Sequence, residues 1–482
     1  MTMTITSAFA NALSGLTASS RQAAVTSNNI ANALVPGYAR RSVEATPGPL
    51  GGVQILGITR HRDQAMVTER RDVGADHANA DTLNTYRTRV EDIIGTPEDG
   101  TSLSGLYARF ESALVDAASR PDLPERQAAL LTAATNVTQG LNDKQDQIQR
   151  LREHADAEIS ATVLRTNDLL VQIHDLNEAV GRARNSHSET ASLIDMRQQA
   201  IDELSGIVPV RTAPRDGGAL AVYTPGGTIL LDGKPGSFDF DRSNTITPYQ
   251  TFAAGTLSGL TFRGESIDVS PNGPLAGSRL SALFQVRDEF SVQAQSRLDS
   301  AARDLIERFQ DPALDPTRAP GDPGLFTDNG SAFATADEVG IAGRVAVNAA
   351  VDPTRGGATW RLRDGLSAAA PGAIGNASLL HDMQAAMTAR RTPSNSDLGT
   401  SGLSAAAFAS SVESLAGIER QASEDRLAFA AVRQSEMEER YLADGVDTDE
   451  EMQNLLQIEQ NYAANARMIQ VLDEMMDLLL RI

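Results

Sequence analysis

The last stretch of the chain, TDEEMQNLLQIEQNYAANARMIQVLDEMMDLLLRI (residues 448–482), decides how the rest is organised. Apolar side chains recur there at alternating steps of three and four residues, which is the spacing of a helical stripe packed against a partner. Thr448 and Glu451 have the spacing of a capping box at the start of this helix. The stripe consists of Leu455, Ile458, Tyr462, Asn465, Ile469, Leu472, Met476 and Leu479. Asn465 is its polar member, and it either fixes the register of the pairing or faces solvent.

The opposite end of the chain carries the same rhythm, with small side chains at half of the positions. This stripe runs through Ile5, Phe9, Ala12, Leu16, Ser19, Ala23, Thr26 and Ile30. Residues 1–62 hold five arginines against Glu44 alone, a net charge of +4, whereas residues 436–482 hold twelve acidic residues against three arginines, a net charge of −9. We therefore predict that the two ends associate, within one molecule or between molecules. The spacing is equally compatible with terminal helices that merely close one bundle.

Composition narrows the classes of function. The chain has 482 residues and a formal net charge of −21, which argues against a nucleic-acid partner. The absence of cysteine excludes disulfides and thiolate metal sites. The first twenty residues lack Lys, Arg and a continuous apolar core, so we expect no cleavable secretory signal, and no run reaches the length of a membrane span.

A polar motif follows the first stripe, SNNIANALVPGYARR (residues 27–41). Asn28, Asn29 and Asn32 are poor helix formers, so we expect their side chains to gain hydrogen bonds in return. Pro36 and the glycine after it are expected to end the helix. Together with ALSGLTASSRQAAVTSNNIAN (residues 12–32), which overlaps it, the motif resembles the N-terminal motif of the flagellar axial proteins, the family of rod, hook and hook-associated proteins.

Residues 124–184 contain no proline after Pro124 and keep a three-four apolar repeat, which predicts a rod-like helix of about 90 Å. Long helices after the N-terminal motif are typical of the hook-associated branch of that family. SLIDMRQQAIDELSGIVPV (residues 192–210), GGTILLDG (226–233) and DGVDTDEEMQNLLQIEQNYAANARMI (444–469) resemble further motifs of the same branch. The resemblance is weak or absent over much of residues 235–375.

The predicted fold is mainly α with an inserted β-rich domain: a long helical bundle or coiled-coil stalk from both chain ends, and an outer antiparallel β domain. Strands are expected at residues 219–223, 228–231, 245–252, 257–262, 341–347 and 359–362. The expected domains are residues 1–40 with 446–482 for terminal assembly, residues 41–206 with 277–310 and 374–445 for the stalk, residues 207–276 for the outer β domain, and residues 311–373 as a loop and strand segment packed on either.

No catalytic constellation emerges from the sequence. The six histidines are scattered without paired metal spacing, and no phosphate-binding loop is present. Pairs of acidic residues are weak evidence for acid–base catalysis here, because the chain has 63 acidic residues. The acidic cluster at 444–450 lacks the alternation and central glycine of an EF-hand. We therefore predict a protein that is not an enzyme and uses no cofactor or metal.

The resemblance implies a structural, self-assembling protein that joins hook to filament outside the cell. Implied partners are further copies in a ring or short helical layer, the hook protein, the filament-side junction protein and a cytoplasmic export chaperone at the C-terminal helix, without nucleic acid or membrane insertion. The alternatives are another axial protein, or an extracellular enzyme domain on an assembly stalk. Candidate interface residues are the two stripes with Asn28, Asn29, Asn32 and Tyr38. The ends are expected to be poorly ordered in a free monomer.

Overall fold

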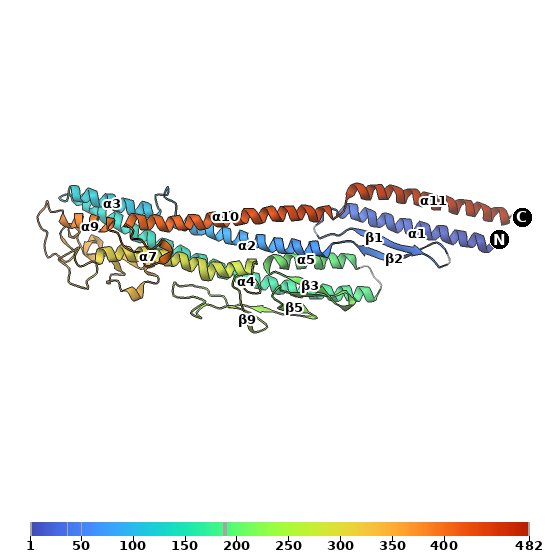
Figure 1. Ribbon diagram of the computed structural model, residues 1–482, viewed down its shortest axis with the longest axis horizontal. Helices are drawn as coiled ribbons and strands as arrows, with labels where there is room; N and C mark the ends of the chain where they lie inside the picture. The colour runs from blue at the N-terminus through green and yellow to red at the C-terminus, as the bar shows by residue number, and fades with distance from the viewer. Residues whose placement is uncertain (1, 36, 50, 187–189, 481–482) are drawn as a thin grey trace.

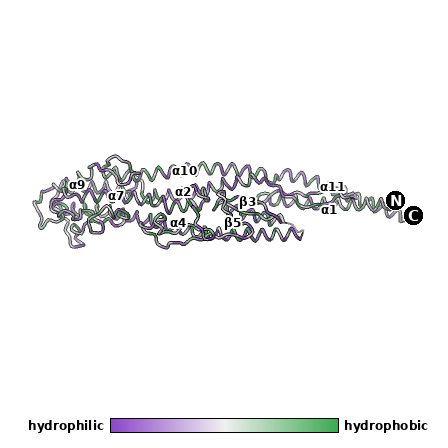
Figure 2. The backbone as a smooth tube through the Cα atoms, turned by 60° about the horizontal axis from the view of Figure 1, so that its bottom comes forward, coloured by the Kyte–Doolittle hydropathy of each residue, from purple (hydrophilic) through white to green (hydrophobic). Residues whose placement is uncertain are grey.

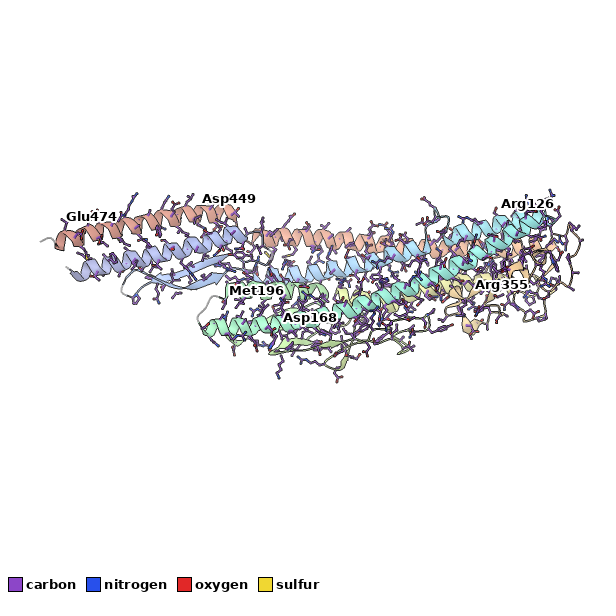
Figure 3. The ribbon with its side chains drawn as sticks, turned by 180° about the vertical axis from the view of Figure 1, so that it is seen from behind. Arg126, Asp168, Met196, Arg355, Asp449 and Glu474 are labelled. Atoms are coloured by element: carbon purple, nitrogen blue, oxygen red, sulfur yellow. The ribbon has the colours of Figure 1, made fainter. Side chains whose placement is uncertain are left out.

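The protein is an elongated, mainly helical molecule with small antiparallel sheets, as predicted (Figure 1). The computed structural model describes residues 2–35, 37–49, 51–186 and 190–480, and the side chains of those between 5 and 478. Pro36, which was expected to end the first helix, lies outside the described residues. Both chain ends lie at one end of the molecule, near Glu474, whereas Arg126 and Arg355 lie at the opposite tip (Figure 3).

The two ends of the chain form a narrow extension that we call the terminal pair. Helix α1 (Thr2–Asn32) lies along α11 (Thr448–Leu480), and the hairpin of β1 (Arg41–Pro47) and β2 (Val53–Arg60) packs against α1. The two strands of the hairpin are antiparallel, with Arg41 opposite Arg60. Figure 2 shows this extension as the thinnest part of the molecule, with no further layer around it.

Long helices form the stalk. Helix α2 (Gln64–Ile94) packs along α10 (Ala405–Ala443), and α4 (Pro124–Asn185) packs against α5 (Ala191–Ile207). With 62 residues, α4 is about 93 Å long, which confirms the predicted rod. Pro124 occupies the first turn, where its missing N–H removes no intrahelical bond.

The core of the stalk follows the apolar repeat of α4. Leu130, Leu141, Ile148 and Ile159 are fully buried. Burying each such side chain contributes about 1.5–3 kcal/mol relative to leaving it in water. The helices that cover or extend this core are α3 (Leu103–Ser119), α6 (Arg279–Gln285), a π-helical turn (Val286–Phe290), α7 (Ser291–Gln310), α8 (Arg361–Asp364) and α9 (Ser378–Thr388).

An aromatic cluster closes the core at the tip. The rings of Phe110, Phe309 and Phe326 are mutually in contact, with centroids 5.0 to 5.7 Å apart. Their tilted and edge-on arrangement is the one that aromatic quadrupoles favour. Phe326 begins β10 (Phe326–Asp328), which pairs with β11 (Val345–Val347), so the cluster also holds this small sheet on the helices.

Two further sheets lie along one side of α4. Asparagines on α4 anchor them: the side-chain amide of Asn167 both donates to and accepts from the backbone of Phe238, and Asn177 does the same with Leu220. Each amide thus satisfies both backbone polar groups of one strand residue, in the edge strand β7 and in β4. The strands are β3 (Arg211–Pro214), β4 (Leu220–Tyr223), β5 (Ile229–Asp232) and β6 (Lys234–Pro235) in one sheet, and β7 (Phe238–Asp239), β8 (Leu260–Phe262) and β9 (Glu265–Ile267) in the other.

The strand predicted at 245–252 is wrong, because this segment is an irregular loop. The backbone carbonyls of Thr247 and Gln250 accept hydrogen bonds from Arg152 of α4, at 3.2 and 2.5 Å, in place of strand partners. Arg152 is 1% exposed, and burial lowers its pKa to about 10. A buried guanidinium with several N–H donors can satisfy a loop that no strand pairs.

Three other predicted strands need correction. Residues 359–362 form a turn that leads into α8. The segment 341–347 starts as a 3₁₀ turn, because the carboxylate of Asp299 accepts from the backbone N–H groups of Gly340 and Ala342 at 2.8 and 2.9 Å, and only its end is a strand. The strand predicted at 257–262 is likewise confined to its last three residues. The domain division itself remains a prediction.

Candidate assembly interface of the terminal pair

Small side chains let the two terminal helices approach closely. Ala12, Ala18 and Val25 of α1 are buried in the seam. A Cβ atom on Gly15 would lie 2.9 Å from the side-chain amide of Asn465, so only glycine leaves room for the asparagine at this point. Asn465 is half-buried in the seam, which answers the alternative that it faces solvent.

The pairing covers the predicted stripes only in part. Ala12, Ser19, Thr26 and Leu472 are buried, whereas Phe9, Tyr462 and Met476 are 38 to 46% exposed. The side chain of Leu479 lies outside the described residues. The other predicted apolar or polar members are half-buried: Ile5, Leu16, Ala23, Ile30, Leu455, Ile458, Asn465 and Ile469. One partner helix is therefore insufficient to cover either stripe.

A second apolar stripe on α11 faces away from α1. Met468, Val471, Met475 and Leu478 follow three-four spacing and are 46 to 62% exposed. On α1, Leu13 is 49% exposed. A row of exposed large apolar side chains on one helix is typical of a surface that another protein covers. We call the four residues of α11 the outer stripe.

Asn29 joins three segments where the terminal pair meets the hairpin. It is completely buried. Its Nδ2 donates to the carbonyl of Arg41 at 2.8 Å and to the carboxylate of Glu451 at 3.1 Å. Its Oδ1 accepts from the hydroxyl of Tyr38 at 2.8 Å and from the backbone N–H of Arg41 at 3.1 Å. The amide group thus fixes the positions of α1, β1 and α11 relative to each other.

The other asparagines of the motif do not enter this network. The side chain of Asn32 donates to the carbonyl of Asn28 at 2.8 Å, a local bond within α1, and Asn28 is exposed. The expectation that these asparagine side chains form hydrogen bonds is therefore confirmed for Asn29 and Asn32. The structure brings together only Asn29 and Tyr38 of the four predicted motif residues.

The predicted capping box at the start of α11 is wrong. The carboxylate of Asp447 accepts from the backbone N–H groups of Asp449 and Glu450, so Asp447 caps the helix. Glu451 turns instead toward the N-terminal motif, where it accepts from Nε of Arg40 at 2.6 Å. This hydrogen bond raises the pKa of Arg40. Glu451 is 3% exposed, so the ion pair is shielded from water on its acidic side.

Two arginines link this network to the stalk. Arg41 and Arg60, on opposite strands of the hairpin, both donate to Asp195 of α5, at 2.5 and 2.8 Å. Arg62 also donates to the carbonyl of Tyr38. The arginine excess of the N-terminal segment therefore pairs with acidic residues of both α11 and α5. We call Asn29, Tyr38, Arg40, Arg41, Arg60, Asp195 and Glu451 the junction network.

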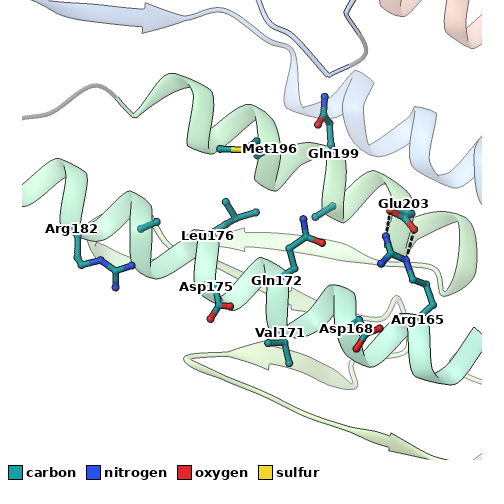
Figure 4. A pocket seen from close by; sticks show the side chains of 12 residues that line it. Arg165, Asp168, Val171, Gln172, Asp175, Leu176, Arg182, Met196, Gln199 and Glu203 are labelled. Atoms are coloured by element: carbon teal, nitrogen blue, oxygen red, sulfur yellow. Dashed lines mark hydrogen bonds and ion pairs between the residues drawn. The ribbon is translucent and has the colours of Figure 1, made fainter.

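A groove of about 870 Å³ lies between α4 and α5, farther down the stalk (Figure 4). Arg165 and Glu203 face each other across it through two hydrogen bonds of 2.6 and 2.7 Å. Both side chains are about half exposed, so this pair contributes little to stability. The described residues contain no group of three His, Asp or Glu side chains that could hold a metal ion. None of the described helices is both long enough and apolar enough to cross a membrane.

Comparison with sequence models of protein families gives matches at both ends and in the middle. Residues 9–38 match the flagella basal body rod protein family, and residues 443–482 match the C-terminal family of flagellar basal body rod FlgEFG proteins. Residues 87–323 match the helical domain of the flagellar hook-associated protein FlgK. The chain is therefore similar to flagellar axial proteins at both ends and to the hook-associated protein FlgK in between.

Relatives called flagellar hook-associated protein 1 extend this match. The Bacillus subtilis protein is 23% identical and covers 95% of both chains. The Salmonella typhimurium protein is 25% identical over 54% of this chain, and the chain spans about half of that relative, 52% of its length. The solved structure of the flagellar hook junction protein FlgK from Burkholderia pseudomallei aligns over 54% of this chain and 46% of its own, with a TM-score of 0.46 and 18% identity.

Several residues of the junction network were not predicted from the sequence. Arg40, Arg60, Asp195 and Glu451 lie far apart along the chain, and Glu451 was assigned to a cap. The opposite net charges of the two ends were the available signal. The net charges predicted that the two ends attract each other, but they did not identify which residues form ion pairs.

Proposed function

We propose that this chain is a structural subunit of the bacterial flagellum that joins hook to filament, and that its terminal pair packs against those of neighbouring subunits in a tubular layer. The observation that carries the proposal is the outer stripe, which stays exposed after α1 and α11 have paired. Its neighbours in the layer are further copies, the hook protein below and the filament-side junction protein above.

Similarity to these flagellar families supports the same role. The two matched rod-protein families lie at the chain ends, which form the terminal pair, and the hook-associated match covers much of the stalk. A subunit whose ends follow the common pattern of axial proteins is suited to pack on the hook, while its own stalk is suited to present a different surface to the filament.

Deletion of the gene tests the position in the flagellum. Electron microscopy of cells lacking the protein is expected to show hooks without filaments, with filament protein released into the medium. Filaments of normal number and length would contradict a junction role. Loss of the hooks as well would favour the alternative of a hook protein.

Substitution of the outer stripe tests the assembly surface. Val471→Glu with Met475→Glu places charges on the outer stripe, so we expect a folded monomer that fails to support filaments. The seam residue next to them provides the contrast, because Leu472→Glu acts first on the pairing of α1 with α11. Normal filaments from the outer-stripe variant would contradict assembly through this surface.

We also propose export to the cell exterior without a cleavable signal, with a cytoplasmic chaperone covering α11 before export. The exposed apolar side chains of α11 support this, since they need cover until the neighbouring subunits provide it. Co-purification of the chaperone with wild type but not with a chain lacking residues 448–482 would support this. Equal recovery with both chains would contradict it.

The proposed role is structural and not catalytic. Side-chain hydrogen bonds from α4 hold the outer sheets, through Asn167 and Asn177, and the segment 311–373, through Asn142. An enzyme domain on the stalk remains the alternative. Hydrolase activity of the full chain, lost on substitution of residues in 207–375 without loss of filaments, would favour that alternative.

A further inference from the structure

A pocket of about 230 Å³ lies where α2, α5 and the C-terminal part of α10 meet. These helices meet at the end of the stalk from which the terminal pair extends (Figure 1). Arg70, Arg71 and Gly74 of α2 and Asp202 and Gly206 of α5 contribute to its lining. It shares no residue with the junction network or with the outer stripe. Its chemistry therefore needs an explanation of its own.

Arg70 and Arg71 carry more N–H donors than the pocket offers hydrogen-bond acceptors. Arg71 is 4% exposed, and its Nη2 atom is buried without a hydrogen-bond acceptor among the described residues; Nε of Arg70 is in the same situation. The two arginines share Asp202: Oδ1 accepts from Nε of Arg71 at 2.8 Å, and Oδ2 accepts from Arg70. Each buried donor without an acceptor costs about 1–3 kcal/mol. Burial also lowers the pKa of Arg71, which shows that Asp202 compensates its charge incompletely.

A tyrosine of α10 holds guanidinium groups beside the pocket. The ring centroid of Tyr441 lies 4.0 Å from Cζ of Arg62 and 4.2 Å from Cζ of Arg70, a double cation–π contact. The hydroxyl of Tyr441 is also buried without a partner among the described residues. The remaining acids are peripheral: the side chain of Glu438 is 47% exposed and 3.7 Å from Arg70, and Asp444 is exposed. Asp202, which is partly buried, is therefore the carboxylate that faces several cationic groups.

Two glycines create the open space. Gly74 lies inside α2, and Gly206 lies in the last turn of α5; neither has a positive φ. A Cβ atom on either would meet nothing within 4 Å. Backbone conformation and packing therefore require glycine at neither position, although glycine in a helix costs about 1 kcal/mol relative to alanine. What the two glycines provide in common is room next to the arginines.

We propose that this pocket binds a small tetrahedral oxyanion, inorganic phosphate or sulfate, through Arg70 and Arg71. Guanidinium groups present paired N–H donors that match the oxygens of such ions, and the ion supplies the negative charge that Asp202 alone does not. Because the pocket touches three helices, the bound ion fastens the end of α10 to α2 and α5. The ion thereby stabilises the part of the stalk from which the terminal pair extends.

Calorimetric titration of the full-length chain with sodium phosphate tests the proposal, with sodium chloride holding the ionic strength constant at pH 7. We expect saturable binding to one site per chain, a matching rise in Tm, and the same behaviour with sodium sulfate. Acetate is expected to bind at least about tenfold more weakly, since it lacks the second charge and the tetrahedral shape. No saturable heat with phosphate or sulfate, or equal binding of acetate, would overturn the proposal.

Glycine variants locate the site. Gly206→Asp places a carboxylate in the pocket without a steric clash, so phosphate binding should weaken at least about tenfold while the circular dichroism spectrum stays unchanged. Gly181→Asp is the matched control, because a Cβ on this α4 residue also meets nothing within 4 Å and the residue lies outside the pocket. Undiminished binding by Gly206→Asp would overturn the assignment, and so would equal weakening in the control.

Discussion

The stalk and the terminal pair are both built from long helices with three-four apolar spacing, but their apolar side chains end in different surroundings. In α4, which packs against α3, α5, α6 and α7, Leu141 and Ile148 are fully buried. In α11, Leu472 is the one described apolar side chain that is buried, and Val471 next to it is 54% exposed. The same apolar spacing therefore gives a closed core where several helices pack around it. Where only one helix packs against it, part of the apolar surface stays exposed. The stalk thus has a closed core of its own, whereas the terminal pair leaves apolar side chains uncovered.

The largest effect is expected in the stalk. Phe110→Ala removes the ring that contacts Phe309 and Phe326, and should lower the free energy of unfolding by about 3–5 kcal/mol. Val115→Ala on the same helix is the control: its side chain is 57% exposed, and it should change that energy by less than about 1 kcal/mol. Urea denaturation followed by circular dichroism measures both. Similar losses for the two variants would show that the tip is not a closed core.

The second effect concerns a buried carboxylate of the stalk. Burial raises the pKa of Asp299 from 3.8 to about 6. Its contribution to stability is therefore fully present below pH 4 and decreases as the pH rises from about 4 to 6, by about 3 kcal/mol for two pH units. Asp299→Asn lacks this titration, so the unfolding energy of wild type minus that of the variant should fall over this range. A difference that is constant between pH 4 and 7 would contradict the buried, ionisable state of Asp299.

A smaller and more local effect is expected at the junction network. Asn29→Ala removes the bond to Oε2 of Glu451 and leaves the backbone groups of Arg41 without their side-chain partner, which should cost about 1–3 kcal/mol. Hydrogen exchange of amides in α11 and the hairpin should accelerate, while exchange in α4 stays as in wild type. Asn28→Ala is the control because Asn28 is exposed. Acceleration throughout the stalk would contradict a local role.

The smallest effect on the isolated chain is expected at the outer stripe. Val471→Glu with Met475→Glu should change the free energy of unfolding by less than about 1 kcal/mol, since both side chains are about half exposed before and after. Leu472→Glu should lower the protection of α11 from hydrogen exchange much more, because Leu472 is buried in the seam. If the outer-stripe variant loses as much protection as the seam variant, the two faces of α11 are not distinct. The prediction that the free ends are poorly ordered is tested by the same exchange data on wild type.

The long elements could be predicted from the sequence, and the irregular ones could not. Periodicity over many residues predicted α4 and the two terminal helices, because one helical face must repeat along the whole length. The predicted strand at 245–252 failed because its carbonyls bond to Arg152, a residue about a hundred positions away. The strand propensity of a segment does not reveal a hydrogen-bond partner that lies far away along the chain.

The candidate site was predicted as two stripes and a polar motif, and the structure adds which of these side chains meet. Asn29, Asn167 and Asn177 all present their amides to both polar groups of one strand residue, yet nothing in the sequence around them distinguishes them from Asn28. Glu451 matched a capping pattern, but Asp447 was available to cap and Arg40 offered a stronger, charged partner. Such choices depend on which residues the fold brings close.

The bond between the hairpin and α5 has a mechanical consequence. The chain itself crosses from the terminal pair and its hairpin to the stalk between β2 and α2 and between α10 and α11. Asp195, held by Arg41 and Arg60, adds a third attachment on a helix that is contiguous with neither crossing. A rotation applied to the terminal pair is therefore resisted at this ion-paired attachment as well as at the two chain crossings.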